Sequence, residues 1–170
     1  MTGGTGAVSA GCAGAQLAFA EDPSGAGTAS QPWPVHSHLS FAALPLAVSC
    51  ARLHVRWVCL EWGLRSIAET AELLASELMT NAIQESARLK TRADLAIVPV
   101  VNLWLVSDGI SLVIHVWDAS DDMPARKDFT ADDEGGRGLM LVDSLGKEWG
   151  AYRKAEGGKV VWVMIASADP

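Results

Sequence analysis

The sequence has few cysteines, few basic residues and no long apolar run, and each shortage excludes a class of protein. Cys12, Cys50 and Cys59 form no Cys-x-x-Cys pair or Cys/His cluster, so neither a disulfide framework nor a zinc site is predicted. Thirteen Lys and Arg against twenty Asp and Glu give a net charge of −7, which argues against direct nucleic-acid or anionic-membrane binding. No apolar run is long enough to span a membrane. We therefore expect a reduced, cytoplasmic setting.

The chain divides into an extension and one domain. Residues 1–35 are rich in Gly, Ala and Ser, contain Pro23, Pro32 and Pro34, and show no helical or alternating apolar period. This composition is typical of a disordered extension. Residues 36–170 are of a length that suits one domain.

Within that domain, helical patterns come first and strand patterns later. We predict a short strand at 38–42, helices at 46–61 and 66–88, a strand at 96–106, and a strand at 110–117 after the hairpin residues Asp108 and Gly109. A short helix at 138–144 and a hairpin of 148–153 with 159–165 complete the pattern. This order favours an α+β fold, a two-layer α/β sandwich. In 46–61 the apolar residues at helical spacing are Val48, Leu53, Val55, Trp57, Val58 and Leu60. In 110–117 alternation places Ile110, Leu112, Ile114 and Val116 on one face.

The helix predicted at 66–88 has one polar face that is suited to chemistry. Glu77 and Asn81 are four positions apart, which places them about 40° apart around the helix axis. Gln84 and Arg88 extend this polar stripe. A carboxylate can accept a proton, and an amide oxygen is a hard ligand for Mg²⁺. The opposite face is small and apolar and should face the core: Ala68, Ala71, Ala75, Leu78, Met79, Ala82 and Ile83. A solvated helix face remains the ordinary alternative.

Asp118 directly follows an apolar strand pattern and opens the stretch Asp-Ala-Ser-Asp-Asp-Met-Pro. A buried carboxylate at a strand end can accept a hydrogen bond from an exocyclic amine such as that of adenine, whereas guanine presents an acceptor at the equivalent place. The alternative is an Asp that forms a turn after a strand.

A third stretch, Gly135 to Val142, reads Gly-Gly-Arg-Gly-Leu-Met-Leu-Val. Glycines allow backbone N–H groups to approach phosphate oxygens, and the N-terminus of a following helix adds partial positive charge. Arg137 could add a charge-assisted contact. The stretch lacks the Gly-Lys-Ser/Thr of a P-loop and does not follow a first strand, so it is neither a P-loop nor a dinucleotide fingerprint. The alternative is a glycine hinge before a helix.

Taken together, these stretches give the chain its resemblance to a known family. Glu77-Leu-Met-Thr-Asn81-Ala on a helix, Val-Trp-Asp118 at a strand end, and Gly136-Arg-Gly-Leu-Met-Leu-Val-Asp143 after a long loop occur in that order. The pattern resembles the GHKL, or Bergerat-fold, ATPases, and within them the small bacterial anti-sigma-factor serine kinases. The resemblance runs from about residue 40 to 166. It implies that helices cover one face of a mixed, mainly antiparallel sheet.

The resemblance also implies roles for individual residues. Asn81 would hold the Mg²⁺ that bridges the phosphates of ATP, and Glu77 would act as the general base or its positioner. Asp118 would accept from the adenine amine, with Ser120 beside the base. Residues 121–136 would form a lid over the nucleotide. The phosphate-binding residues implied are Gly136, Arg137, Gly138 and Leu139.

The function implied is that of an anti-sigma factor that phosphorylates an anti-anti-sigma protein of the STAS type, with a sigma factor or that protein as partner and a homodimer as one arrangement. The alternative is a non-catalytic, nucleotide-dependent protein-binding module. Two positions depart from the family pattern near the base: Ser120 where Gly is frequent, and Val160 where Thr is frequent. Gln84-Glu85 also replaces a stretch that is basic or contains His in many relatives. A sensor histidine kinase is disfavoured, because none of the four His residues lies in a pair of predicted dimerisation helices.

Overall fold

The computed structural model describes residues 35–93, 98–124 and 137–166. The predicted extension, the strand start before residue 98 and most of the predicted lid lie outside these ranges. The elements in chain order are β1 (Val35–Ala42), α2 (Leu46–Glu61), a 3-10 turn (Arg65–Ile67), α3 (Ala68–Ala93), β2 (Val100–Ser107), β3 (Ser111–Asp118), α4 (Arg137–Leu145), β4 (Glu148–Arg153) and β5 (Lys159–Ala166).

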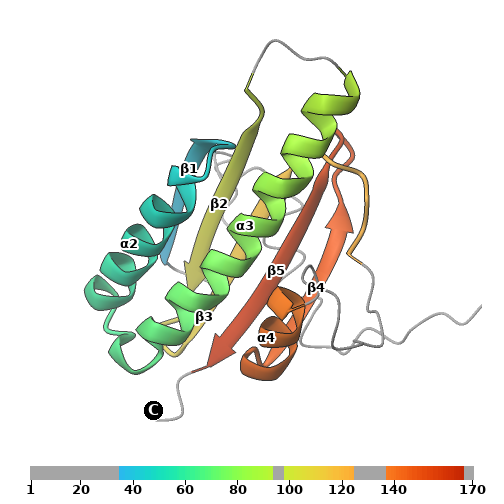
Figure 1. The fold of residues 1–170 in the computed structure, drawn as a ribbon. Helices are drawn as coiled ribbons and strands as arrows, with labels where there is room; N and C mark the ends of the chain where they lie inside the picture. Colours follow the sequence, from blue (N-terminus) through green and yellow to red (C-terminus); the bar gives the residue numbers. More distant parts are fainter. Residues whose placement is uncertain (1–34, 94–97, 125–136, 167–170) are drawn as a thin grey trace, which may run out of the picture.

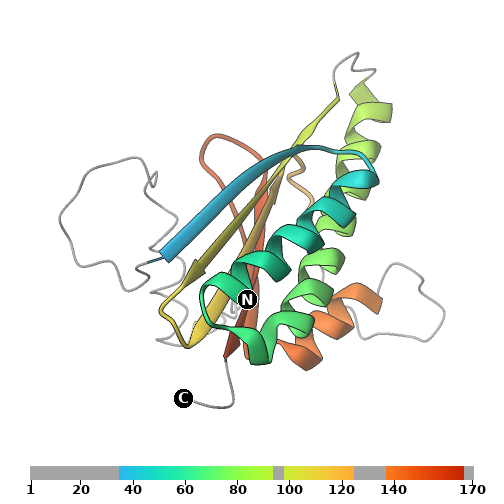
Figure 2. The same ribbon diagram turned by 90° about the vertical axis from the view of Figure 1, so that its left-hand side faces the viewer.

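The predicted two-layer α+β fold is confirmed. The five strands form one sheet in the order β1-β2-β3-β5-β4. Every pair of neighbouring strands is antiparallel, so the described sheet is wholly antiparallel rather than mixed. The three helices lie on one face of the sheet, with α3 running obliquely across its middle (Figures 1 and 2).

Local sequence determines where these elements begin and end. Pro45 precedes α2, and Gly63 ends it with a positive φ of 75°, as expected for a glycine just past a helix. Between β2 and β3, Gly109 has a φ of 90°, and Asp108 Oδ1 accepts from the backbone N–H groups of Ile110 and Ser111 at 2.9 and 2.6 Å. The predicted hairpin turn is therefore confirmed.

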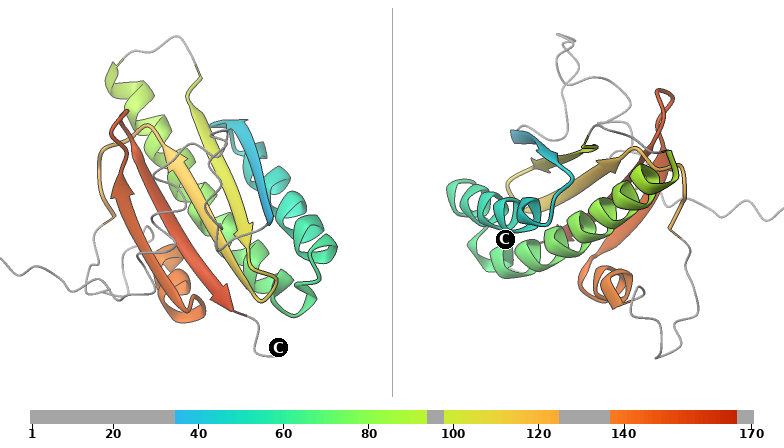
Figure 3. Two further views of the ribbon diagram at one scale, coloured as in Figure 1. Left: turned by 180° about the vertical axis from the view of Figure 1, so that it is seen from behind. Right: turned by 45° about the horizontal axis from the view of Figure 1, so that its top comes forward.

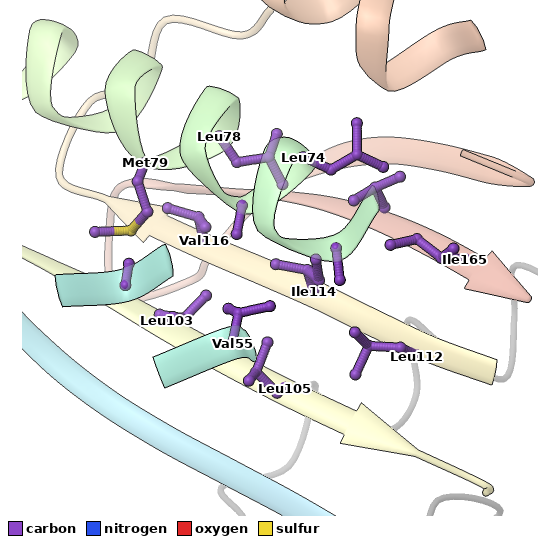
Figure 4. Packing of buried hydrophobic residues seen from close by; sticks show 14 of the residues in the cluster. Val55, Leu74, Leu78, Met79, Leu103, Leu105, Leu112, Ile114, Val116 and Ile165 are labelled. Carbon is purple, nitrogen blue, oxygen red and sulfur yellow. The ribbon is translucent and has the colours of Figure 1, made fainter. Parts of the chain in front are cut away.

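The core lies between the helices and the inner face of the sheet. All seven residues predicted for the apolar face of the long helix are buried. Figure 4 shows Leu74, Leu78 and Met79 of α3 directed toward the sheet, where Ile114 and Val116 of β3 meet them. A smaller cluster of Val106, Val113 and Trp162 covers the outer face, which Figure 3 shows from behind.

The structure corrects parts of two predicted apolar patterns. The pattern predicted for 46–61 includes Leu53, Trp57 and Leu60, but these side chains are 71%, 62% and 38% exposed. Ala47, Ala51, Val55, Val58 and Cys59 form the buried face of α2 instead. Ile110, predicted to share one strand face with Leu112, Ile114 and Val116, lies in the turn before β3 and is 53% exposed.

Within the described ranges, no helix combines the length and the apolarity needed to cross a membrane.

Candidate functional site

Glu77 and Asn81 lie on α3 where α4 packs against it. Both side chains are half-buried. Gly138 of α4 is the point of closest approach, because a Cβ atom there would lie 2.6 Å from Glu77 Oε2 and 3.5 Å from Asn81 Nδ2. Only glycine leaves the Glu77 carboxylate in this position. The fold therefore brings the predicted carboxylate, the predicted amide and one of the predicted glycines together, with the beginning of α4 beside the N-terminal half of α3 (Figure 1).

Asp118 ends β3 on the same, helix-facing side of the sheet. It follows the inward-facing residues Leu112, Ile114 and Val116 in alternation, and its side chain is buried. Its Oδ1 accepts from the backbone N–H of Ser120 at 2.8 Å and from Lys159 Nζ at 2.9 Å. The carboxylate is thus held at the strand end by a turn and by an ion pair.

Opposing influences act on the pKa of Asp118. Burial raises it, the hydrogen bond and positive charge of Lys159 and the N–H of Ser120 lower it, and the charge of Glu85 on α3 adds a smaller rise. The net direction is upward. Lys159 is nearly as buried as Asp118, and its Nζ lies 2.9 Å from Asp118 Oδ1 in an ion pair.

The charge of Glu85, on the later part of α3, acts on Asp118. Glu77, which contacts Gly138, lies two turns earlier on the helix. Eight residues of helix span about 12 Å of axis. The two ends of the site are therefore separated along α3 by a distance comparable with an extended nucleotide, with Asn81 between them.

Asp121 connects two loops next to Asp118 by hydrogen bonds. Its Oδ1 accepts from the backbone N–H of Gly158 at 3.2 Å, and its carbonyl oxygen accepts from Arg153 Nε and Nη2 at 3.2 and 3.0 Å. Trp117 Nε1 donates to the carbonyl of Gly157 at 3.2 Å. These bonds join the segment after β3 to the turn between β4 and β5, and so hold Asp118 beside Lys159.

The remaining predicted residues have mixed outcomes. Ser120 is buried next to Asp118, and its Oγ accepts from the backbone N–H of Asp122 at 3.1 Å. Leu139 is half-buried on α4. Gly136 lies outside the described residues, and Arg137 is described only as the first residue of α4.

The side chain of Val160 lies on the outer face of the sheet, the opposite face from that of Asp118. It pairs with Trp117 and Tyr152 in the sheet, and it alternates with Lys159 and Val161, which face the helices. The side chain at this end of β5 that faces the site is therefore that of Lys159, which sequence reasoning missed. The alternation of the strand could have identified it. Residues 159, 161, 163 and 165 share one face of the strand, and the last three are apolar, so Lys159 is on the core-facing side.

A groove of about 410 Å³ between α2 and α3 shares only Glu77 with this site. It is lined by Arg52, Arg56, Glu69, Glu72, Leu73 and Ser76 as well. Across it, Arg56 Nη1 forms an ion pair with Glu72 Oε1 at 3.2 Å. Neither Asn81 nor Asp118 reaches it, so we do not assign the nucleotide to this groove.

The donor set at Glu77 and Asn81 fits Mg²⁺ held largely by a nucleotide. Among the described residues, no group of three His, Cys, Asp or Glu side chains could form a metal cage. Mg²⁺ retains several waters and is commonly held by one or two protein oxygens together with substrate phosphates. A single amide oxygen beside a glycine-lined helix N-terminus meets that requirement.

Comparison with known proteins agrees with this geometry. A search of curated proteins found no match. Residues 41–165 match the family model of the histidine kinase-like ATPase domain, which implies ATP binding, usually with Mg²⁺. The match runs from the last two residues of β1 into β5 and includes every site residue described above. Together with the α+β sandwich, it shows that the chain belongs to the histidine kinase-like ATPase family.

Proposed function

We propose that this ATPase-family protein is an ATP-dependent serine/threonine kinase that acts as an anti-sigma factor in the cytoplasm. Its substrate would be an anti-anti-sigma protein of the STAS type, and its sequestered partner a sigma factor. The observation that supports this proposal most is the close contact of Glu77 and Asn81 of α3 with Gly138 of α4. A carboxylate and an amide oxygen there share one end of a site whose other end holds a buried carboxylate, Asp118.

Each residue then has a defined task. Asn81 would hold Mg²⁺ through its amide oxygen, and the bound ion would supply positive charge to the phosphates. Glu77 accepts the proton of the attacking serine hydroxyl while the serine oxygen forms its bond to the γ-phosphorus and ADP leaves. Asp118 accepts from the adenine amine, and the backbone at Gly138 approaches the phosphates. Phosphoryl transfer needs chiefly such positioning and charge neutralisation.

The exposed side of α2 offers a surface for a protein partner. Leu53 and Trp57 lie one turn apart, are largely exposed, and are flanked by the exposed Arg52 and Arg56. Large apolar side chains beside arginines are typical of protein-binding surfaces. Their position next to the groove that reaches Glu77 supports a substrate protein that docks near the proposed base.

Two substitutions on α3 test the proposal. Asn81→Ala removes the Mg²⁺ ligand, so ATP affinity should fall and lose most of its Mg²⁺ dependence in a calorimetric titration. Glu77→Gln retains size and hydrogen bonding but cannot accept the proton. It should retain ATP binding while phosphoryl transfer from γ-labelled ATP to a STAS-type protein slows by roughly 10²–10⁴-fold. Gln84→Ala is the matched control, since Gln84 is exposed on the same polar stripe.

The outcomes separate kinase from binding module. If Glu77→Gln changes neither ATP binding nor partner affinity and wild type transfers no phosphate, the protein is the non-catalytic, nucleotide-dependent module. If Asn81→Ala binds Mg·ATP as tightly as wild type, the assignment of this part of α3 to the phosphates is wrong.

A further inference from the structure

Lys159 is a buried lysine at the first position of β5. Its residue is only 4% exposed, and its side chain lies on the helix-facing side of the sheet opposite Asp118. The Nζ donates to Asp118 Oδ1 at 2.9 Å. Lysines are rarely this buried without a specific partner, because removing an ammonium from water is costly.

The pair leaves hydrogen-bonding capacity unused on both sides. An ammonium has three N–H donors, and among the described residues Lys159 Nζ makes one hydrogen bond, to Asp118. Within the same part of the chain, both hydrogen bonds to the Asp118 side chain end on Oδ1. Oδ2 of Asp118 is therefore free to accept, and Nζ of Lys159 is free to donate, at neighbouring points of one buried site.

We propose that Lys159 is a second base-contacting residue, which donates to N1 of adenine while Asp118 accepts from the N6 amine. The inference rests on the proposed ATP site. Adenine presents a donor, the amine, next to an acceptor, N1, along one edge of the ring. An ammonium beside a carboxylate is the complementary pair. Guanine presents an acceptor and then a donor along that edge, so it would require the two side chains in reverse order.

A purely structural role gives a different expectation. The ion pair joins the end of β3 to the start of β5 and could serve only to fix these strands. In that case the protein would not sense whether the base carries a nitrogen or a carbon at ring position 1. The ligand can therefore be changed while the protein is left intact.

The test is a calorimetric titration of the full-length wild-type chain with Mg²⁺ and ATP, 1-deaza-ATP or 7-deaza-ATP. 1-Deaza-ATP keeps the amine and replaces N1 by C–H, and 7-deaza-ATP keeps both the amine and N1. Wild type should bind 1-deaza-ATP on the order of 10-fold or more weakly than ATP, as expected for one lost hydrogen bond to a charged group. 7-Deaza-ATP should bind as ATP does.

The same titrations on variants assign the effect to Lys159. Lys159→Met should bind ATP and 1-deaza-ATP equally, whereas Lys147→Met, at an exposed lysine outside the site, should discriminate as wild type does. Equal binding of ATP and 1-deaza-ATP by wild type overturns the inference and leaves the ATP site standing. Absence of any ATP binding by wild type overturns the proposed site itself. If Lys159→Met does not fold, the wild-type comparison still decides.

Discussion

Gly138→Ala is expected to separate the stability of this fold from its chemistry. The added methyl would lie 2.6 Å from Glu77 Oε2, about 0.8 Å closer than the 3.4 Å at which ordinary van der Waals contact begins. The obstructing atom is the end of a flexible side chain rather than backbone, so the Glu77 carboxylate moves and the helices stay. The substitution therefore displaces the proposed base without removing it.

Opposing contributions make the expected stability change small. Forcing Glu77 away from its preferred rotamer costs about 0.5–1.5 kcal/mol. Replacing glycine by alanine within α4 stabilises by about 0.5–1 kcal/mol. The net free energy of unfolding should stay within about 1 kcal/mol of wild type. Misplacing a catalytic group by about 1 Å can reduce a rate by about 10²-fold, so phosphoryl transfer should fall by that order.

Urea unfolding and the phosphotransfer assay together measure both quantities. Gly109→Ala is the control, because it should change stability and not transfer. Gly109 lies in the β2–β3 turn at a φ of 90°, and a Cβ atom added there would have no atom within 4 Å. It should destabilise the fold by about 1 kcal/mol and leave transfer unchanged. A Gly138→Ala protein with wild-type transfer would refute the assignment of Glu77 to the reacting end of the site.

Three further predictions concern the adenine contact, the turn between β4 and β5, and a buried histidine. If Asp118 accepts a hydrogen bond from the adenine amine, ATP and ADP should raise Tm and GTP should not. The reason is that a buried carboxylate left without its hydrogen bond costs on the order of 1–3 kcal/mol. Equal stabilisation by ATP and GTP would contradict this. Gly158→Ala should lower the free energy of unfolding in urea by about 2 kcal/mol or more, because φ at this position is 77° and the new Cβ would lie 2.3 Å from the backbone oxygen of Asp118. A variant as stable as wild type would show that this turn can change its conformation at little cost. Burial lowers the pKa of His115 to about 3, so below pH 6.5 only the unfolded chain takes up this proton. The contribution of this residue to the free energy of unfolding is thus complete above pH 6.5 and falls by up to about 5 kcal/mol as the pH approaches 3. In His115→Phe the free energy of unfolding should differ less between pH 7 and pH 4 than in wild type. An unchanged difference would show that other groups cause the acid sensitivity.

The sequence determined the secondary structure well wherever one face of an element is buried. The period of α3 identified all seven of its predicted core residues, and Pro45 and Gly63 bounded α2, because these effects are local. Leu53 and Trp57 were misassigned because apolar character alone does not say which side of a helix meets the sheet. Only the packing of α2 against α3 and β1 decided that face.

The sequence also supplied the residues of the site through the spacing of Glu77 and Asn81 and the strand-end position of Asp118. It could not supply their partners, which come from distant parts of the chain. Gly138 must be glycine because α4 packs on Glu77, and Lys159 meets Asp118 only because β5 pairs with β3. Periodicity is a property of neighbouring residues, whereas a site is a set of long-range contacts, and strand order and helix packing decide which contacts form.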